Sequence, residues 1–247
     1  MQDTELLRYS RQIMLPDFDI AGQQALQQAR VLIVGIGGLG SPAALYLAAA
    51  GVGRLVLCDG DQVELTNLQR QIAHNTQSLG ENKAQSARRA ITDINPHTEV
   101  EVINAHLEQA HLTALLPNID LVLDCTDNFD SRFMINEECW RAGIPVVSGA
   151  AIRWEGQVAV FDPQSPHAPC YRCLYPSSDN DPLNCSDTGV IAPLVGIIGT
   201  CQALEAIKLI AGVGETLTGY VLYVDSKYMD WRKLKLSKRK DCPVCAH

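Results

Sequence analysis

Glycines between positions 35 and 40 have the spacing of a phosphate-binding turn. Gly35, Gly37 and Gly40 form a Gly-x-Gly-x-x-Gly pattern with Gly38 inside it, directly after the apolar run at residues 31–35 and before an alanine-rich, helix-forming segment. In such a context the glycines let the backbone approach a ligand, and the N–H groups and dipole of the helix start favour negative charge. The pattern indicates a nucleotide phosphate at this turn. A tight turn without a ligand is the alternative.

A carboxylate follows at the distance that dinucleotide-binding folds use for the ribose. A second apolar run, residues 55–58, ends at Asp59, about 20 residues after Gly40. This arrangement predicts that Asp59 binds ribose hydroxyl groups beside the glycine turn. The glycines do not separate NAD, FAD and ATP as the ligand, because proteins of this fold that bind any of the three can share them.

A third apolar strand, residues 121–124, runs into further acidic residues. Ligands of open α/β sheets bind beyond the carboxyl ends of the strands, so Asp127 is our candidate ligand for Mg²⁺, with Asn128 beside it. Asp124 is better explained as a helix cap or as a buried, hydrogen-bonded carboxylate.

Four of the nine cysteines form two Cys-x-x-Cys pairs, Cys170 with Cys173 and Cys242 with Cys245. Together the pairs complete the tetrahedral four-sulfur shell of structural zinc, which leaves no open position for a substrate. We therefore expect Zn²⁺ to fasten the C-terminal tail to the body of the protein. A redox pair is the alternative, and it is disfavoured because neither pair follows a strand into a helix.

The composition is that of an ordinary globular protein from a reducing compartment. A chain of 247 residues with 47% apolar residues can bury a large core as one domain, and its net charge of −8 argues against broad nucleic-acid binding. The charged segment 1–12 has no apolar leader. Residues 189–214 are apolar but interrupted by Pro193, Glu205 and Lys208, which favours a buried helix over a membrane span. Paired cysteines without a secretion signal point to the cytoplasm.

The order of expected elements predicts a Rossmann-like α/β fold. Strands alternate with helices at first, which favours a parallel sheet with helices on both faces, and later strands with little helix between them favour an antiparallel continuation. We expect one domain over residues 1–247. The expected strands are 31–35, 55–58, 99–104, 121–124, 144–148, 157–161, 220–224 and 231–236, the helices include 6–13, 22–28, 82–94, 108–116 and 131–142, and a loose loop covers 177–183.

The residues after Asp59 narrow the ligand to ATP by resemblance. Asp61, the stretch from Asn67 through Leu68 and Gln69 to Arg70, and RYSRQ near the N-terminus together resemble the ubiquitin-activating-like adenylating enzymes, the HesA/MoeB/ThiF family. The resemblance covers nearly the whole chain. It implies an ATP-binding set of Gly35, Gly37, Gly38, Gly40, Asp59, Asp61, Asn67, Leu68, Gln69, Arg70, Lys83, Asp127 and Asn128.

The resemblance also implies how charge is managed. Arg11 would reach the ATP phosphates in the site of a partner subunit, which implies a homodimer, while Arg70 and Lys83 would neutralise the phosphates within the chain. With Mg²⁺ on Asp127, these cations would offset the charge that develops as a carboxylate attacks the α-phosphate and pyrophosphate leaves. The attacking carboxylate is ionised at neutral pH, so the reaction needs no general base.

The substrate implied by the resemblance is the C-terminal Gly-Gly carboxylate of a small ubiquitin-like sulfur carrier. MgATP adenylates it, and a persulfide donor then supplies sulfur to give a thiocarboxylate. Residues 94–97 and 148–152 favour the branch of the family that serves molybdopterin, in molybdenum cofactor biosynthesis, over the thiamine branch. Adenylation of the thiamine-pathway carrier, an NAD-binding oxidoreductase and a non-catalytic scaffold are the alternatives. The last two would not need Asn67, Arg70 and Lys83 together.

The remaining cysteines fall into two groups. Cys185 lies in a polar stretch and matches a cysteine that relatives use in sulfur transfer or in a covalent link to the partner, with an inert role as the alternative. Cys58, Cys125, Cys139 and Cys201 lie in apolar or helical segments and are expected to be core residues. No role is assigned to the six histidines, which show no pairing at metal or triad spacing.

Overall fold

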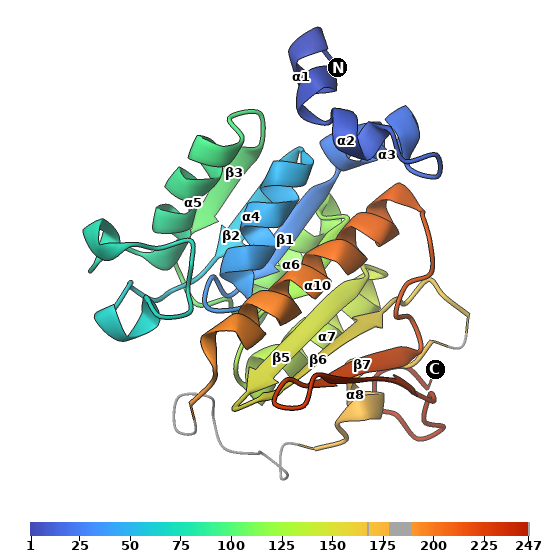
Figure 1. Cartoon of the computed structure of the whole chain (residues 1–247). Coiled ribbons are helices and arrows are strands. Elements are labelled where there is room, and N and C mark those ends of the chain that lie inside the picture. Colours follow the sequence, from blue (N-terminus) through green and yellow to red (C-terminus); the bar gives the residue numbers. More distant parts are fainter. Residues whose placement is uncertain (167, 178–188, 247) are drawn as a thin grey trace.

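The structure is a computed structural model that describes residues 1–166, 168–177 and 189–246. Eight strands form one sheet in the order β3-β2-β1-β4-β5-β6-β7-β8, with helices on both faces (Figure 1). The strands are β1 (Arg30–Val34), β2 (Arg54–Cys58), β3 (Glu99–Ile103), β4 (Leu121–Asp124), β5 (Val146–Ile152), β6 (Glu155–Phe161), β7 (Tyr220–Asp225) and β8 (Asp230–Lys235). The α-helices are α1 (Asp3–Arg8), α2 (Ser10–Ile13), α3 (Asp19–Gln28), α4 (Gly40–Ala50), α5 (Lys83–Ile94), α6 (Gln109–Leu115), α7 (Phe129–Ala142), α8 (Tyr171–Leu174) and α10 (Ala192–Ala211), and the 3-10 helices are η1 (Leu65–Asn67), η2 (Thr76–Ser78) and η3 (Leu116–Asn118).

The sheet changes from parallel to antiparallel along its width. Strands β3, β2, β1, β4 and β5 pair in parallel, whereas β6, β7 and β8 continue the sheet in antiparallel order. This confirms the predicted mixed Rossmann-like sheet. Because β2 and β3 extend the sheet on one side of β1, and β4 and β5 on the other, the strand order reverses between β1 and β4. Sheets of this kind bind ligands at that point.

Alternate residues of the parallel strands enter two separate cores, one on each face. On β1, Val31 and Ile33 pack with α4, α5 and α10, whereas Leu32 packs with α6 and α7 on the other face. Successive side chains of a strand point to opposite faces, so a strand that is apolar at every position needs cover on both. The continuous apolar runs of the sequence are explained by this two-sided cover.

Helix α10 lies along one face of the sheet beside α4 (Figure 1). Within the described ranges it is the one helix long and apolar enough to span a membrane, but such a helix can equally be a core helix, as the sequence predicted. Pro193 lies in its first turn, where a missing N–H does not break a helix, and the Glu205–Lys208 ion pair lies within its last turns. Its packing against α3, α4, β4, β5 and β6 is that of a core helix.

A buried glutamine fastens α10 to the sheet near the reversal of strand order. Gln202 is 0% exposed, and its Nε2 donates to the carbonyl oxygens of Asp124 at 2.8 Å and Val147 at 3.1 Å. Gly149 leaves the space for this side chain, because a Cβ there would stand 2.3 Å from Gln202 Oε1. The glutamine therefore ties α10 to the carboxyl end of β4 and to β5.

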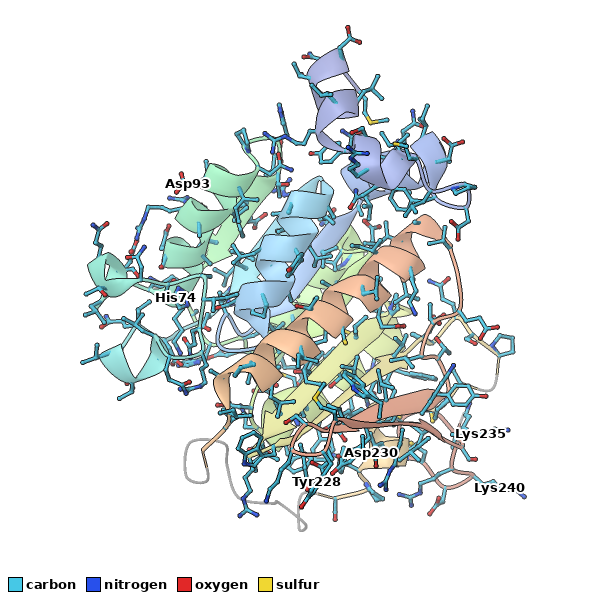
Figure 2. All side chains as sticks on the ribbon, in the orientation of Figure 1. His74, Asp93, Tyr228, Asp230, Lys235 and Lys240 are labelled. Atoms are coloured by element: carbon cyan, nitrogen blue, oxygen red, sulfur yellow. The ribbon has the colours of Figure 1, made fainter. Side chains whose placement is uncertain are left out.

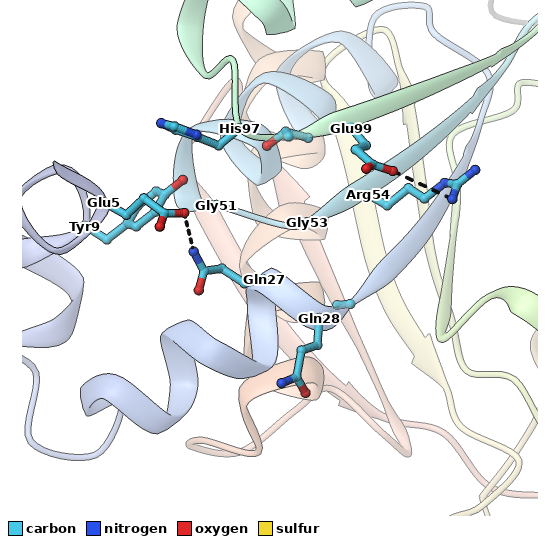
Figure 3. A pocket seen from close by; sticks show the side chains of 11 residues that line it. Glu5, Tyr9, Gln27, Gln28, Gly51, Gly53, Arg54, His97 and Glu99 are labelled. Atoms are coloured by element: carbon cyan, nitrogen blue, oxygen red, sulfur yellow. Dashed lines mark hydrogen bonds and ion pairs between the residues drawn. The ribbon is translucent and has the colours of Figure 1, made fainter. Parts of the chain in front are cut away.

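The N-terminal segment is not the single helix predicted for residues 6–13. It divides into α1 and α2 because Tyr9 turns inward between them. Tyr9 is buried, its ring lies over Gly51 at the end of α4, and its hydroxyl accepts a hydrogen bond from Asn95 Nδ2 at 2.8 Å. A polar cleft of about 340 Å³ remains beside it (Figure 3). This cleft lies at the C-terminal end of α4, opposite to the glycine turn.

Replacing Gln202 with methionine keeps the length of the side chain but removes both N–H donors. We expect the free energy of unfolding to fall by about 2 kcal/mol or more, because two buried carbonyl groups lose a partner. Urea unfolding measures the change. Gln24→Met on the exposed side of α3 is the matched control and should change stability by less than about 0.5 kcal/mol. Equal stabilities of the two variants would contradict the anchoring role.

Candidate functional site

A cleft of about 360 Å³ opens where the strand order reverses, at the carboxyl ends of β1, β2 and β4. Its wall combines the glycine turn, the loop after β2, the start of α5 and the loop after β4. The structure thus brings most of the predicted nucleotide-binding residues together. Those that line it are Gly35, Gly37, Gly38, Asp59, Asp61, Arg70, Lys83, Asp127 and Asn128, and they are joined by Gln71, His106, Thr126 and Arg132.

The glycine turn requires glycine at two positions for different reasons. Gly35 has a φ of +87°, a conformation that residues with a side chain rarely adopt, and a Cβ there would stand 2.8 Å from the carbonyl oxygen of Cys125. At Gly40 a Cβ would stand only 1.9 Å from the carbonyl oxygen of Gly35. The turn is therefore tight enough to place the first N–H groups of α4 at the cleft, where they favour an anion.

Asp59 connects the end of β2 to this turn. Its Oδ2 accepts a hydrogen bond from Ile36 N at 2.7 Å, and its Oδ1 accepts one from Asp61 N at 2.8 Å. The carboxyl group is largely buried, and burial raises its pKa while the nearby Lys83 ammonium opposes that shift. Asp59 therefore shapes the turn, and each oxygen keeps a further lone pair for a ligand.

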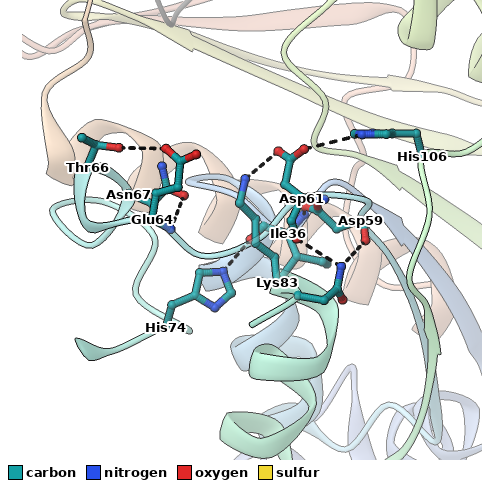
Figure 4. Close-up of polar contacts among 10 residues, drawn as sticks. Ile36, Asp59, Asp61, Glu64, Thr66, Asn67, His74, Lys83 and His106 are labelled. Carbon is teal, nitrogen blue, oxygen red and sulfur yellow. Dashed lines mark hydrogen bonds and ion pairs between the residues drawn. The ribbon is translucent and has the colours of Figure 1, made fainter. Parts of the chain in front are cut away.

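Lys83, the first residue of α5, forms an ion pair with Asp61 in the cleft (Figure 4). The Lys83 Nζ lies 2.7 Å from Asp61 Oδ2, and only 9% of the lysine side chain is exposed. Asn82 caps the helix through Gln85 N and donates to the carbonyl oxygens of Asp59 and Asp61. These contacts hold a buried cation beside the glycine turn.

The four residues of the predicted stretch from Asn67 to Arg70 do not all lie at the cleft. Asn67 is buried, and its Oδ1 accepts a hydrogen bond from Glu64 N at 3.2 Å, which caps η1. Asn67, Leu68 and Gln69 do not line the cleft, whereas Arg70 does, with its guanidinium donating to the carbonyl oxygen of Thr66 at 3.0 Å. The structure thus gives Asn67 a role in positioning Arg70, and direct contact with a nucleotide stays a prediction for the first three.

Asp124, the last residue of β4, and Asp127 in the loop that follows differ in the way that the sequence predicted. Asp124 is buried and accepts hydrogen bonds from the hydroxyl groups of Thr126 at 2.7 Å and Ser148 at 2.8 Å. Asp127 is exposed at the cleft, and its carboxylate has no hydrogen-bond or ion-pair partner in the described part of the chain. Asn128 caps α7 through Ser131 N at 2.9 Å. Among the described carboxylates that line the cleft, Asp127 is therefore the one that the fold does not use.

Sequence reasoning missed several residues of this region, including His106 and Thr126. Arg132 donates to the carbonyl oxygen of Thr126 at 2.6 Å and lines the cleft, and its place one turn into a helix after a strand end was a usable signal. Gln71 also lines the cleft and directly follows the predicted stretch. His74, labelled in Figure 2, gave no signal in the sequence.

His74 joins the glycine turn to α5. Its Nε2 lies 3.0 Å from the carbonyl oxygen of Ile36, and its Nδ1 lies 3.0 Å from Ser86 Oγ. A carbonyl oxygen can only accept, so Nε2 carries the proton and Nδ1 accepts from the hydroxyl group. Burial lowers the pKa of His74, which favours this neutral form. The histidine therefore has a structural role beside the site.

Arg11 lies away from the cleft of its own chain. It is exposed on α2, and its neighbour Gln12 donates to the carbonyl oxygen of Ala50 at 3.0 Å, at the last residue of α4. The glycine turn is at the other end of that helix, about 16 Å away for 11 residues. A role for Arg11 in the site of a second subunit stays a prediction.

The four cysteines of the two Cys-x-x-Cys pairs meet in one buried cluster. Their sulfur atoms all lie within 4.8 Å of one another, with Cys170 Sγ 3.5 Å from Cys242 Sγ and Cys173 Sγ 3.4 Å from Cys245 Sγ. These distances are too long for disulfides and close to the edge of a tetrahedron with zinc–sulfur bonds of about 2.3 Å. Burial raises the pKa of the Cys170 thiol to about 12, so a cation is needed to hold the cluster as thiolates.

The other cysteines are mostly core residues, as predicted. Cys58, Cys125 and Cys139 are buried and Cys201 is half-buried. Burial raises the pKa of the Cys58 thiol to about 12, which makes it inert. Cys185 and residues 178–183 of the predicted loose loop lie outside the described residues.

Comparisons with known proteins agree with this geometry. A sequence profile of the ThiF family matches residues 9–244. The molybdopterin-synthase adenylyltransferase of Escherichia coli (strain K12) is 50% identical over 99% of this chain and 98% of that protein, and the sulfur carrier protein ThiS adenylyltransferase of the same strain is 44% identical over 99% and 97%. The crystal structure of E. coli MccB with ATP matches with a TM-score of 0.83 at 25% identity, over 96% of this chain and 74% of that chain. The chain belongs to the ThiF family.

Proposed function

We propose that this protein uses ATP to adenylate the C-terminal Gly-Gly carboxylate of a small ubiquitin-like sulfur carrier in molybdenum cofactor biosynthesis. The observation that carries the proposal is the 50% identity, over nearly both full lengths, to a molybdopterin-synthase adenylyltransferase. The thiamine-pathway carrier is a second candidate substrate, favoured by the 44% identity to a ThiS adenylyltransferase. The NAD-binding alternative has no such relative among the proteins compared above.

The charges of the cleft fit this reaction. Adenylation brings a carboxylate to the α-phosphate of ATP while pyrophosphate leaves, so anions must approach one another. Lys83 and Arg70 provide cations at the glycine turn, and the N–H groups at the start of α4 face the same space. The carboxylate of the carrier is already ionised, so the site needs no general base. Positioning and electrostatics would account for the catalysis.

A magnesium ion fits the carboxylate that the fold leaves unused. Asp127 has no partner in the ranges that the structure describes, and Mg²⁺ is commonly held by one or two carboxylates together with substrate phosphates. When bound, Mg²⁺ would neutralise phosphate charge. Asp127 would hold it, while Asp59 would bind the ribose.

A zinc ion fits the cysteine cluster. Four thiolates complete a tetrahedral shell without an open position, so the ion would be structural. The backbone N–H of Arg239 points to Cys173 Sγ at 3.3 Å, as is common around zinc thiolates. The ion would fasten the C-terminal residues to the segment that contains α8.

A homodimer would complete the site. Arg11 is too far from the cleft of its own chain to reach a phosphate there, so it would act on the cleft of a second subunit. Large apolar side chains around it are exposed and could pack against that subunit, namely Leu7, Met14, Leu15 and Ile20.

The remaining partners follow from the chemistry of the product. An acyl-adenylate is attacked by a nucleophile, and here a persulfide from a separate donor would give the thiocarboxylate. Cys185 remains a candidate for this sulfur transfer.

The cysteines that the structure describes form no disulfide, which supports a reducing compartment such as the cytoplasm.

Removing the cations of the cleft should abolish the reaction. We expect Arg70→Ala and Lys83→Ala each to lower carrier-dependent exchange of labelled pyrophosphate into ATP by about 100-fold or more, because each removes a charge that stabilises the transition state. Arg88→Ala, on the exposed face of α5, is the control and should keep wild-type exchange. Exchange near the wild-type rate in the first two variants, with the fold intact by circular dichroism, would exclude these residues from the mechanism.

Mixed dimers can test the role of Arg11. If it acts on the partner's site, co-expression of Arg11→Ala and Lys83→Ala chains gives heterodimers with one complete site, so a random mixture should recover about a quarter of wild-type exchange. Arg8→Ala is the control and should be active alone, because its guanidinium donates to the carbonyl oxygen of Ile94, away from the cleft. A mixture as inactive as its parents would mean that Arg11 acts within its own chain.

Metal analysis should find one zinc ion per chain. We expect Cys245→Ser to lose the metal and to lower the melting temperature, because the shell loses a ligand and the tail its attachment. Cys139→Ser, at a buried cysteine outside the cluster, should retain zinc. A folded wild-type protein with four free cluster thiols and no metal would refute the zinc site.

A further inference from the structure

Gln71 is buried at the wall of the cleft, and its side chain has no hydrogen-bond partner in the described part of the chain. It is 4% exposed and lines the cleft next to Arg70 and the glycine turn. Its Oε1 is fully enclosed and has no hydrogen bond, and no described residue bonds to its Nε2. A buried carboxamide in this condition costs free energy, and native structures rarely keep one without a reason.

The backbone holds this side chain in place even though its carboxamide is free. Gln71 N donates to the carbonyl oxygen of Asn67 at 3.0 Å, and the carbonyl oxygen of Gln71 accepts from His74 N at 3.1 Å. His74 in turn bonds to the glycine turn and to α5. The fold therefore fixes the backbone of Gln71 beside the glycine turn, and the side chain stands there with Oε1 enclosed and Nε2 near Gly37.

The position of the carboxamide identifies the kind of group that it meets. Gln71 Nε2 lies 3.5 Å from the place that a Cβ of Gly37 would occupy, so it stands over the middle of the glycine turn. Lys83 and Arg70 line the same part of the cleft, which makes it a site for anions. An amide N–H that donates to an anionic oxygen forms a charge-assisted hydrogen bond, which is stronger than one between neutral groups.

We propose that Gln71 contacts the nucleotide directly, with Nε2 donating to a phosphate oxygen of bound ATP. This inference rests on the proposed function and adds a residue outside the predicted ATP-binding set. The ligand then supplies the acceptor that Nε2 lacks among the described residues, while Oε1 stays enclosed behind it.

The experiment measures ligand affinity and stability together. Binding of MgATP and of adenosine to the wild type and to Gln71→Met is followed by calorimetry, and melting temperatures are recorded without ligand. We expect MgATP to bind Gln71→Met about tenfold more weakly, because a hydrogen bond to a charged group is lost, while adenosine binds as it does to the wild type. The melting temperature without ligand should stay equal or rise, because methionine removes an unpaired buried oxygen.

A second variant and a control separate the possible outcomes. Gln71→Glu keeps the shape but places an anion beside the phosphates, so it should weaken MgATP binding more than Gln71→Met does, and Gln24→Met should bind both ligands like the wild type. Wild-type affinity for MgATP in both Gln71 variants would overturn the proposal, as would a fall in melting temperature with equal losses for ATP and adenosine. If the wild type binds MgATP but shows no carrier-dependent pyrophosphate exchange, the proposed function fails while the contact stands.

Discussion

The carboxylate of Asp59 connects the parts of the cleft that come from different strands. One oxygen binds the glycine turn after β1 through Ile36 N, and the other binds the loop after β2 through Asp61 N. Asn82 donates to the carbonyl oxygen of the same residue and caps the helix that carries Lys83. A change at Asp59 would therefore move both the glycine turn and Lys83. Its burial, which raises its pKa, is tolerated because backbone donors and Lys83 compensate it.

Much of the fold could be predicted because its signals are local and repeated. Apolar runs such as the one before Gly35 predict strands covered on both faces, and the alternation with helices predicts a parallel sheet. The two Cys-x-x-Cys pairs could be predicted to lie together, because a closed tetrahedral zinc site needs all four thiols. The sequence could separate the buried Asp124 from the exposed Asp127, because Asp124 ends an apolar strand and Asp127 lies beyond it.

The parts that could not be predicted depend on contacts between distant residues. Tyr9 divides the first helix because Gly51 and Asn95, far along the chain, offer a site for its ring and hydroxyl. Gln202 is polar within an apolar helix, and only the tertiary structure shows the two carbonyl groups that it satisfies. His74 and Gln71 belong to the same class. Isolated polar residues carry no periodic signal, so their partners, or the lack of them, appear only after folding.

The pairing of Lys83 with Asp61 shows how a buried cation can be prepared for an anionic ligand. Removing an ammonium group from water is costly unless an opposite charge lies close, and Asp61 provides that charge at 2.7 Å. The aspartate is far more exposed than the lysine, at 54% against 9% of the side chain. In the proposed complex with ATP, Asp61 would therefore turn towards water, and Lys83 would exchange one anionic partner for another. Lys83 is already buried in the ligand-free protein, so the free energy of phosphate binding would not be consumed in dehydrating it.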